Sequence, residues 1–100
     1  MTQRIPLVPL EEALRIGKDA GLQERMARGS AFRTLAHNPD LLKAVYGQLT
    51  TLLFKNRFDT RLRELMIMRI GWVTGSEYEW TQHWRVATTA GIPPEDILAV

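Results

Sequence analysis

The chain has 100 residues and a formal net charge of +2, from thirteen Lys and Arg against eleven Asp and Glu. This length fits one small domain over residues 1–100, and the 45% hydrophobic and 24% charged shares are those of a folded globular protein. The basic residues are spread among the acids, which argues against a nucleic-acid partner, and no apolar run approaches the roughly twenty residues that cross a bilayer. Since a secretory signal pattern is also lacking, we expect a cytoplasmic chain with no membrane partner.

The N-terminal segments predict an extended arm and then short helices. The prolines of RIPLVPL favour an extended arm over residues 1–10, and the next twenty residues space their apolar side chains as a helix does until two glycines interrupt them. We expect one short helix there. Ser30 is predicted to cap the helical turn AFRTLAH, and Pro39 to begin the helix after it.

Two longer helices are predicted in the middle of the chain. PDLLKAVYGQLTTLLF spaces its apolar residues as an amphipathic helix with one buried face. Asp59 is predicted to cap TRLRELMIMRIGWVTG, whose apolar residues run almost all the way round the helix, as expected of a central helix. Glu64 and Arg69 are its polar exceptions, and they either point inward or, more commonly, lie on a solvated edge.

The last third predicts two further helices. Gly75 ends the central helix, Ser76 opens SEYEWTQHWRVATTA, and Gly91 ends that helix in a left-handed conformation. Pro93 and Pro94 then begin a helix of two turns, too short to be stable without tertiary contacts. We therefore expect that this C-terminal helix is either truncated or packed on another subunit.

The segment GSEYEWTQHW supports two interpretations. Ser76 and Glu79 form the S-x-x-E pattern of a capping box, in which each side chain satisfies a backbone N–H group at the helix start. Glu79 and His83 are four residues apart, so their side chains share a helix face and are able to form a hydrogen bond or an ion pair. Most such pairs are structural, and the remainder include working acid–base sites.

A metal site is not expected. Cysteine is absent, and His37 is the only other histidine, so nothing completes the ligand set that His83 and Glu79 would begin. The nearby aromatics Tyr78, Trp80 and Trp84 either line a pocket, with Trp80 a candidate to bind substrate, or pack in a core or an interface.

The segments LAHNPDLLKAVYGQL and LRELMIMRIGWVTGSEYEWTQHWRVATTAGIPPEDILAV resemble the carboxymuconolactone decarboxylase family, which includes the alkylhydroperoxidase D-like proteins. The resemblance covers about residues 32–100 and includes the pair Arg63-Glu64, His83 and the ending A-x-x-A-G-I. It implies an all-α fold, an alkylhydroperoxidase D-like helical domain of about five to six helices. It also implies a homo-oligomer, a trimer or hexamer in which the motif helices of several subunits pack together.

The peroxidase branch of this family has the signature E-x11-C-x2-C-x3-H, in which glutamate and histidine serve a redox-active cysteine pair. Counted from Glu64, the cysteine positions fall on Ser76 and Glu79, and the histidine position falls on His83. Because neither serine nor glutamate attacks a peroxide as a thiolate does, thiol peroxidase activity is excluded for this sequence. The resemblance then implies the decarboxylase branch, a cofactor-free lyase that acts on a small carboxylated lactone.

The resemblance also implies roles for individual residues. His83 is the expected general acid/base, and Glu79 or Glu64 is expected to orient it or relay its proton. Arg69 or Arg85 is expected to bind a substrate carboxylate, although a surface salt bridge is the commoner role of both. The alternative is a non-catalytic helical oligomer, in which the acid-rich turn only caps a helix and the tryptophans build the subunit contact.

Overall fold

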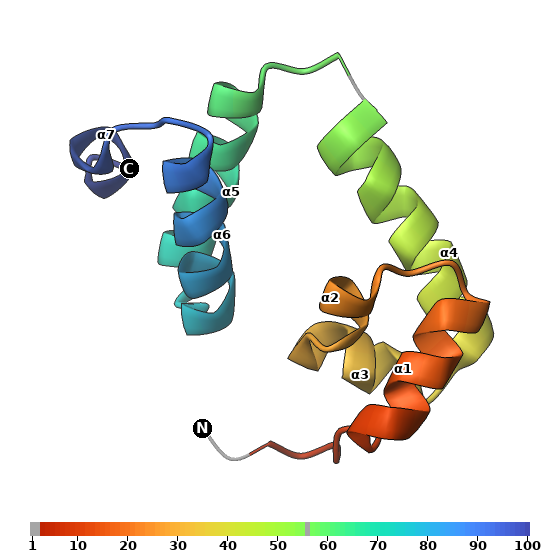
Figure 1. Cartoon of the computed structure of the whole chain (residues 1–100). Coiled ribbons are helices and arrows are strands. Elements are labelled where there is room, and N and C mark those ends of the chain that lie inside the picture. Colours follow the sequence, from red (N-terminus) through yellow and green to blue (C-terminus); the bar gives the residue numbers. More distant parts are fainter. Residues whose placement is uncertain (1–2, 56) are drawn as a thin grey trace. The chain divides into compact units, whose positions relative to one another are not determined.

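The computed structural model describes residues 3–55 and 57–100, and the regular structure within them is entirely helical (Figure 1). The described elements are α1 (Leu10–Asp19), α2 (Glu24–Ala27), α3 (Ser30–Leu35), α4 (Pro39–Thr50), the π-helical η1 (Thr51–Lys55), α5 (Thr60–Thr74), α6 (Glu77–Thr89) and α7 (Pro94–Leu98). The all-α prediction is therefore confirmed. No helix among the described residues is both long and apolar enough to span a membrane. The chain divides into two compact units, Met1–Asn56 and Arg57–Val100, and a single domain over residues 1–100 stays a prediction.

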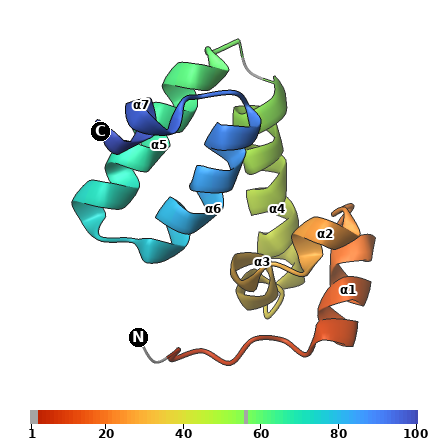
Figure 2. The ribbon, with the colours of Figure 1, turned by 60° about the vertical axis from the view of Figure 1, so that its left-hand side comes forward.

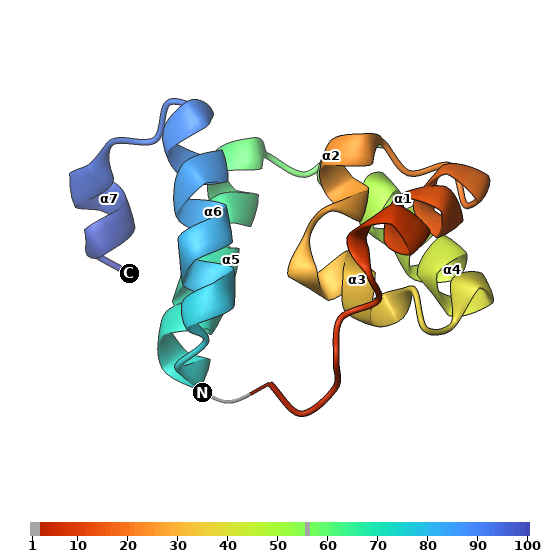
Figure 3. The same ribbon diagram turned by 60° about the horizontal axis from the view of Figure 1, so that its bottom comes forward.

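The first unit packs its N-terminal arm and helices α1, α2, α3 and α4 around one apolar cluster (Figure 3). The arm is held by two backbone carbonyls: that of Val8 accepts from Arg33 Nε at 3.0 Å, and that of Pro6 accepts from His37 Nε2 at 2.6 Å. His37 therefore has a structural partner within this unit. The buried members of the cluster are Val8, Ala13, Ile16, Leu22, Ala27, Ala36 and Leu42.

The helices of the first unit differ from the sequence prediction at three points. The helix predicted over PDLLKAVYGQLTTLLF is α-helical as far as Thr50 and continues as the π-helix η1. Two helices form where one was expected, because Gly21 adopts a left-handed φ of 87° and ends the path of α1. Ser30 is the first helical residue of α3 rather than its cap, and Gly29 precedes it with no side-chain cap bond. Pro39 begins α4 as predicted, with the side chain of Asn38 accepting from the Leu41 N–H at 3.1 Å.

The second unit is a hairpin of α5 and α6, followed by α7 (Figure 2). Asp59 caps α5 as predicted, accepting from the Leu62 N–H at 2.9 Å. Gly75 ends α5 with a φ of 68°, which turns the chain directly into α6. The small buried core of this unit consists of Met68, Ala87, Ile92 and Ile97, with Leu65, Trp80, Trp84 and Val100 packed against it.

The central helix α5 is less enclosed than its apolar sequence suggested. Glu64, Met68 and Gly71 are its buried residues, and they lie on the face that packs on α6. The opposite face carries large apolar side chains that are each about half exposed or more: Leu62, Met66, Ile70 and Val73. The helix thus has an inner face with a charged residue in it and an outer apolar face.

Candidate active site

Glu64 is the buried charged residue of the described chain, with a side chain that is 0% exposed. It shares the inner face of α5 with Met68, one turn further along. Of the two positions considered for Glu64, the inward one is realised, and the solvated edge is not. Arg69, the other polar exception of the helix, is exposed. A buried carboxylate needs compensating partners, and the surroundings of Glu64 supply them.

Both oxygens of Glu64 accept a hydrogen bond. Oε1 accepts from Nδ1 of His83 at 2.7 Å, and Oε2 accepts from Nε of Arg63 at 2.8 Å. Burial is the largest influence on the pKa of Glu64 and acts to raise it, but the hydrogen bonds and charges of His83 and Arg63 together outweigh it. The pKa of Glu64 is therefore held below its ordinary value, and the carboxyl group is ionised at neutral pH.

The ionised Glu64 fixes the proton arrangement of His83. A carboxylate only accepts hydrogen bonds, so the nitrogen that contacts it, Nδ1, must carry a hydrogen. The other ring nitrogen, Nε2, is left to take up or give away a proton. Nε2 lies 3.6 Å from Oε2 of Glu79, too far for a good hydrogen bond but close enough for electrostatic attraction. The His83 side chain is 16% exposed and that of Glu79 is 48% exposed, so this second contact is the outer one.

The predicted capping box is half formed. Ser76 caps α6, since its hydroxyl oxygen accepts from the Glu79 N–H at 3.2 Å. The reciprocal bond is not made, because the N–H of Ser76 donates instead to the carbonyl of Gly71 at 2.9 Å. The Glu79 carboxylate lies beside His83. Backbone bonding at the end of α5 thus leaves Glu79 available to the histidine.

The two arginines predicted to bind substrate have their contacts away from His83. Arg69 donates to the backbone carbonyl of Val100. Arg85 lies two residues beyond His83, on a different face of α6, and lines a shallow pocket of about 370 Å³ with Trp80, Thr81, Trp84 and Leu98. Binding of a substrate carboxylate by Arg69 or Arg85 stays a prediction.

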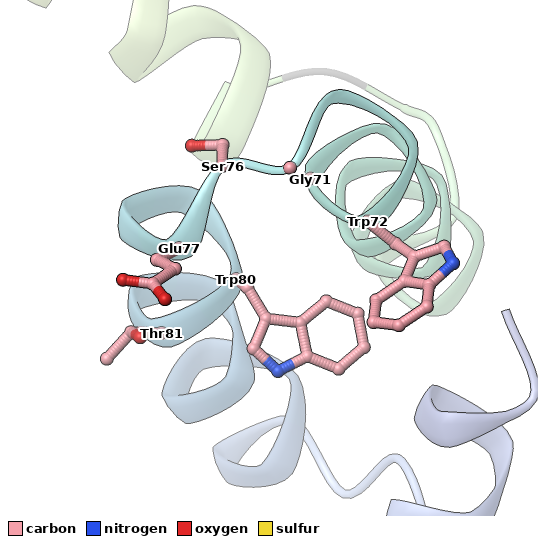
Figure 4. Close-up of a pocket in the computed structure, with 7 residues that line it drawn as sticks. Gly71, Trp72, Ser76, Glu77, Trp80 and Thr81 are labelled. Atoms are coloured by element: carbon pink, nitrogen blue, oxygen red, sulfur yellow. The ribbon is translucent and has the colours of Figure 1, made fainter. Parts of the chain in front are cut away.

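A larger open pocket, of about 560 Å³, lies at the turn between α5 and α6 (Figure 4). Trp80 lines both pockets, so this tryptophan faces open space as well as the core. Neither pocket is lined by Glu64, Glu79 or His83. The lining residues of the larger pocket are Gly71, Trp72, Gly75, Ser76, Glu77, Trp80 and Thr81.

Two contributing residues were not identified as site residues from the sequence. Arg63 was noted only as part of a sequence resemblance, although it supplies one of the two hydrogen bonds to Glu64. Its position next to Glu64 was the available signal. Trp72 was counted among the apolar residues of the central helix, whereas its ring lies 5.9 Å from that of Trp80 in the larger pocket. Its place at the end of the helix, close to the turn, was the signal in that case.

The comparison with protein families agrees with the resemblance noted from the sequence. The model of the carboxymuconolactone decarboxylase family matches residues 39–100. This range is more than half of the chain and contains Glu64, Glu79 and His83, and the chain belongs to the carboxymuconolactone decarboxylase family. Searches of curated proteins and of solved structures gave no significant match.

Proposed function

We propose that the protein is an acid–base enzyme of the lyase type, which acts on a small carboxylated or carbonyl-containing substrate without a cofactor. The observation that carries this proposal is the arrangement of His83 between two carboxylates, with Nδ1 held by buried Glu64 and Nε2 turned toward half-exposed Glu79. This arrangement leaves one defined nitrogen for proton exchange, as general acid–base catalysis requires. Membership in the carboxymuconolactone decarboxylase family supports the same class of reaction.

The proposed step is a decarboxylation followed by protonation. The bond between the substrate carbon and its carboxylate breaks, carbon dioxide leaves, and the electron pair remains on the substrate as an enolate. Nε2–H of protonated His83 gives its proton to the enolate carbon, and Glu79 or water returns a proton to Nε2. Glu64 is a positioning residue in this scheme, because it touches the ring but not the reacting atoms.

The test is turnover on a panel of lactones and keto acids as a function of pH. We expect His83→Ala to lower turnover by about 100-fold or more, since a positioned acid–base group contributes at least that much. Glu79→Gln should lower turnover less and change the pH profile. His37→Ala is the matched control, because His37 is the chain's other histidine and lies in the other unit. Absence of turnover on the whole panel, or equal losses in the two histidine variants, would refute the proposal.

A second role, self-association, is favoured by the outer face of α5. Leu62, Met66, Ile70 and Val73 recur there at helical spacing, and they are 49%, 55%, 59% and 65% exposed. Four large apolar side chains in one stripe are costly to leave in water, and a second copy of the chain would cover them. We propose that the chain forms a homo-oligomer through this stripe, whether or not it is catalytic.

Light scattering at micromolar concentration tests this second proposal. We expect the parent to be oligomeric and Ile70→Glu, in the middle of the stripe, to be smaller. Gln82→Glu introduces the same side chain at an exposed position of α6 and should leave the size unchanged. A monomeric parent would contradict self-association, and so would an Ile70→Glu variant of undiminished size.

A further inference from the structure

The pocket at the turn between α5 and α6 is formed by one short stretch of chain, residues 71–81. Gly75 makes the tight connection possible with its left-handed φ of 68°. The two helices lie close together at Gly71, where an added Cβ would make ordinary van der Waals contact with the backbone of Trp80 at 3.5 Å. The volume of about 560 Å³ is within the usual range for small-molecule sites.

The walls of the pocket are aromatic. The rings of Trp72 and Trp80 lie 5.9 Å apart and are tilted by 57°, and Trp84 continues the row at 6.2 Å from Trp80. These are all three tryptophans of the chain. Trp72 is 66% exposed, although tryptophan is a residue that usually buries most of its large surface. Figure 4 shows the indole rings of Trp72 and Trp80 side by side at the pocket.

The charge in the pocket is negative. Glu77 is the charged residue among those that line it, and Ser76 and Thr81 supply hydroxyl groups. Glu77 is the first residue of α6. Within the described residues no hydrogen bond or ion pair engages the Glu77 side chain. Arg28, Arg61 and Arg63, by contrast, each pair with an acid elsewhere.

We propose that this pocket binds a small organic cation of the alkylammonium type. Indole faces attract such cations, whose methyl or methylene groups also gain apolar contact, and Glu77 supplies the opposite charge. An anion of the same shape would meet the Glu77 carboxylate and be disfavoured. The site is distinct from the proposed acid–base group, because Glu64, Glu79 and His83 do not line it. The inference therefore does not depend on the proposed catalytic function.

Intrinsic fluorescence gives a direct readout, because every tryptophan of the chain lies in this row. Three probes share one shape and differ in charge: choline, its uncharged carbon isostere 3,3-dimethylbutanol, and the anion 3,3-dimethylbutanoate. We expect choline to change the emission of the parent in a saturable way and to bind at least about threefold more tightly than the uncharged isostere. The anion should bind most weakly. Equal binding of choline and the isostere, or no response to choline, would overturn the proposal.

Four variants separate the contributions of charge and aromatic face. Glu77→Gln should remove most of the preference for choline over the isostere, whereas Glu95→Gln, an exposed acid of α7 outside the pocket, should keep it. Trp72→Leu should weaken choline binding about fivefold, and Trp72→Phe should restore part of the loss because phenylalanine keeps an aromatic face. Broadening of the choline methyl signal in proton NMR measures binding independently of the removed fluorophore. Full retention of choline binding in both Glu77→Gln and Trp72→Leu would refute the inference.

Discussion

Replacing Glu64 by glutamine tests whether the buried carboxylate organises the second unit. Glu64 is 0% exposed and accepts two hydrogen bonds from cationic or polar donors, at 2.7 Å from His83 and 2.8 Å from Arg63. Glutamine has one acceptor oxygen, so at least one of these donors would face an NH₂ group. Since a hydrogen bond to a charged group contributes about 1.5–3 kcal/mol, we expect the free energy of unfolding to fall by about 2–4 kcal/mol. This is a large part of the total stability of about 5–15 kcal/mol that is typical of a domain.

Urea unfolding followed by tryptophan fluorescence reports the stability of the second unit, which contains Glu64, because Trp72, Trp80 and Trp84 all belong to that unit. Glu79→Gln is the matched control. The Glu79 side chain is 48% exposed and 3.6 Å from His83 Nε2, so its removal should cost at most about 1 kcal/mol. If the two variants lose the same stability within about 0.5 kcal/mol, Glu64 does not have the organising role that its contacts indicate.

The stability of Glu64→Gln relative to the parent should also depend on pH. The direction of this dependence follows from the lowered pKa of Glu64 and would be the opposite if burial alone set that pKa. The pKa of Glu64 is lowered on folding, so its ionised form stabilises the fold fully above the ordinary glutamate pKa of about 4.3. This stabilisation is lost as the pH falls through the lower pKa of the folded state. The stability difference between the parent and Glu64→Gln should therefore narrow as the pH falls below about 4.3. A difference that widens with acid would mean that burial dominates and that the pKa is raised.

Substitutions at two glycines and at one helix cap should change the stability of the protein, as measured by thermal unfolding followed by circular dichroism. Gly17→Ala should destabilise the first unit by about 1–3 kcal/mol, because the new Cβ would lie 2.7 Å from Cβ of Ala27. Gly47→Ala should instead stabilise the first unit by about 0.5–1 kcal/mol, because Gly47 is an exposed residue of α4 and a Cβ there would meet nothing within 4 Å. Equal effects of the two substitutions on stability would contradict the packing of α1 on α2. Asp59→Ala removes the cap bond to the Leu62 N–H and should cost about 1 kcal/mol, so an unchanged melting temperature would argue against that cap.

The features that depend on neighbouring residues were predicted well from the sequence. Asp59 and Ser76 cap α5 and α6 as predicted, and Gly75 ends α5. A helix cap or a left-handed turn depends on only about four consecutive residues, which the sequence shows directly. The prediction for Ser30 was wrong by one residue. Serine is a good N-cap residue, but Gly29, with its extended backbone, occupies the cap position of α3 instead. A shift of the helix start by one residue changes no expectation about the packing of α3.

The features that depend on packing between helices were not predictable in the same way. Glu64 lies on an apolar helix that offers no amphipathic pattern, so periodicity gave no reason to place it on the inner face. Its burial follows from His83, nineteen residues away, and from Arg63 beside it. The second bond of the capping box is missing for a similar reason, because the N–H of Ser76 donates to the carbonyl of Gly71 at the end of the preceding helix.

Glu79 places a carboxylate beside His83 in a sequence that has no cysteine. Ser76 and Glu79 stand where the peroxidase signature that this chain resembles has its two thiols. Ser76 is used to cap α6, but Glu79 places a carboxylate 3.6 Å from Nε2 of His83, whose Nδ1 is bound by Glu64. A carboxylate at this position cannot reduce a peroxide, and it is able to exchange a proton with imidazole. In the proposed acid–base function, Glu79 would therefore exchange protons with Nε2 of His83, while the ionised Glu64 accepts from Nδ1 and holds the ring in place.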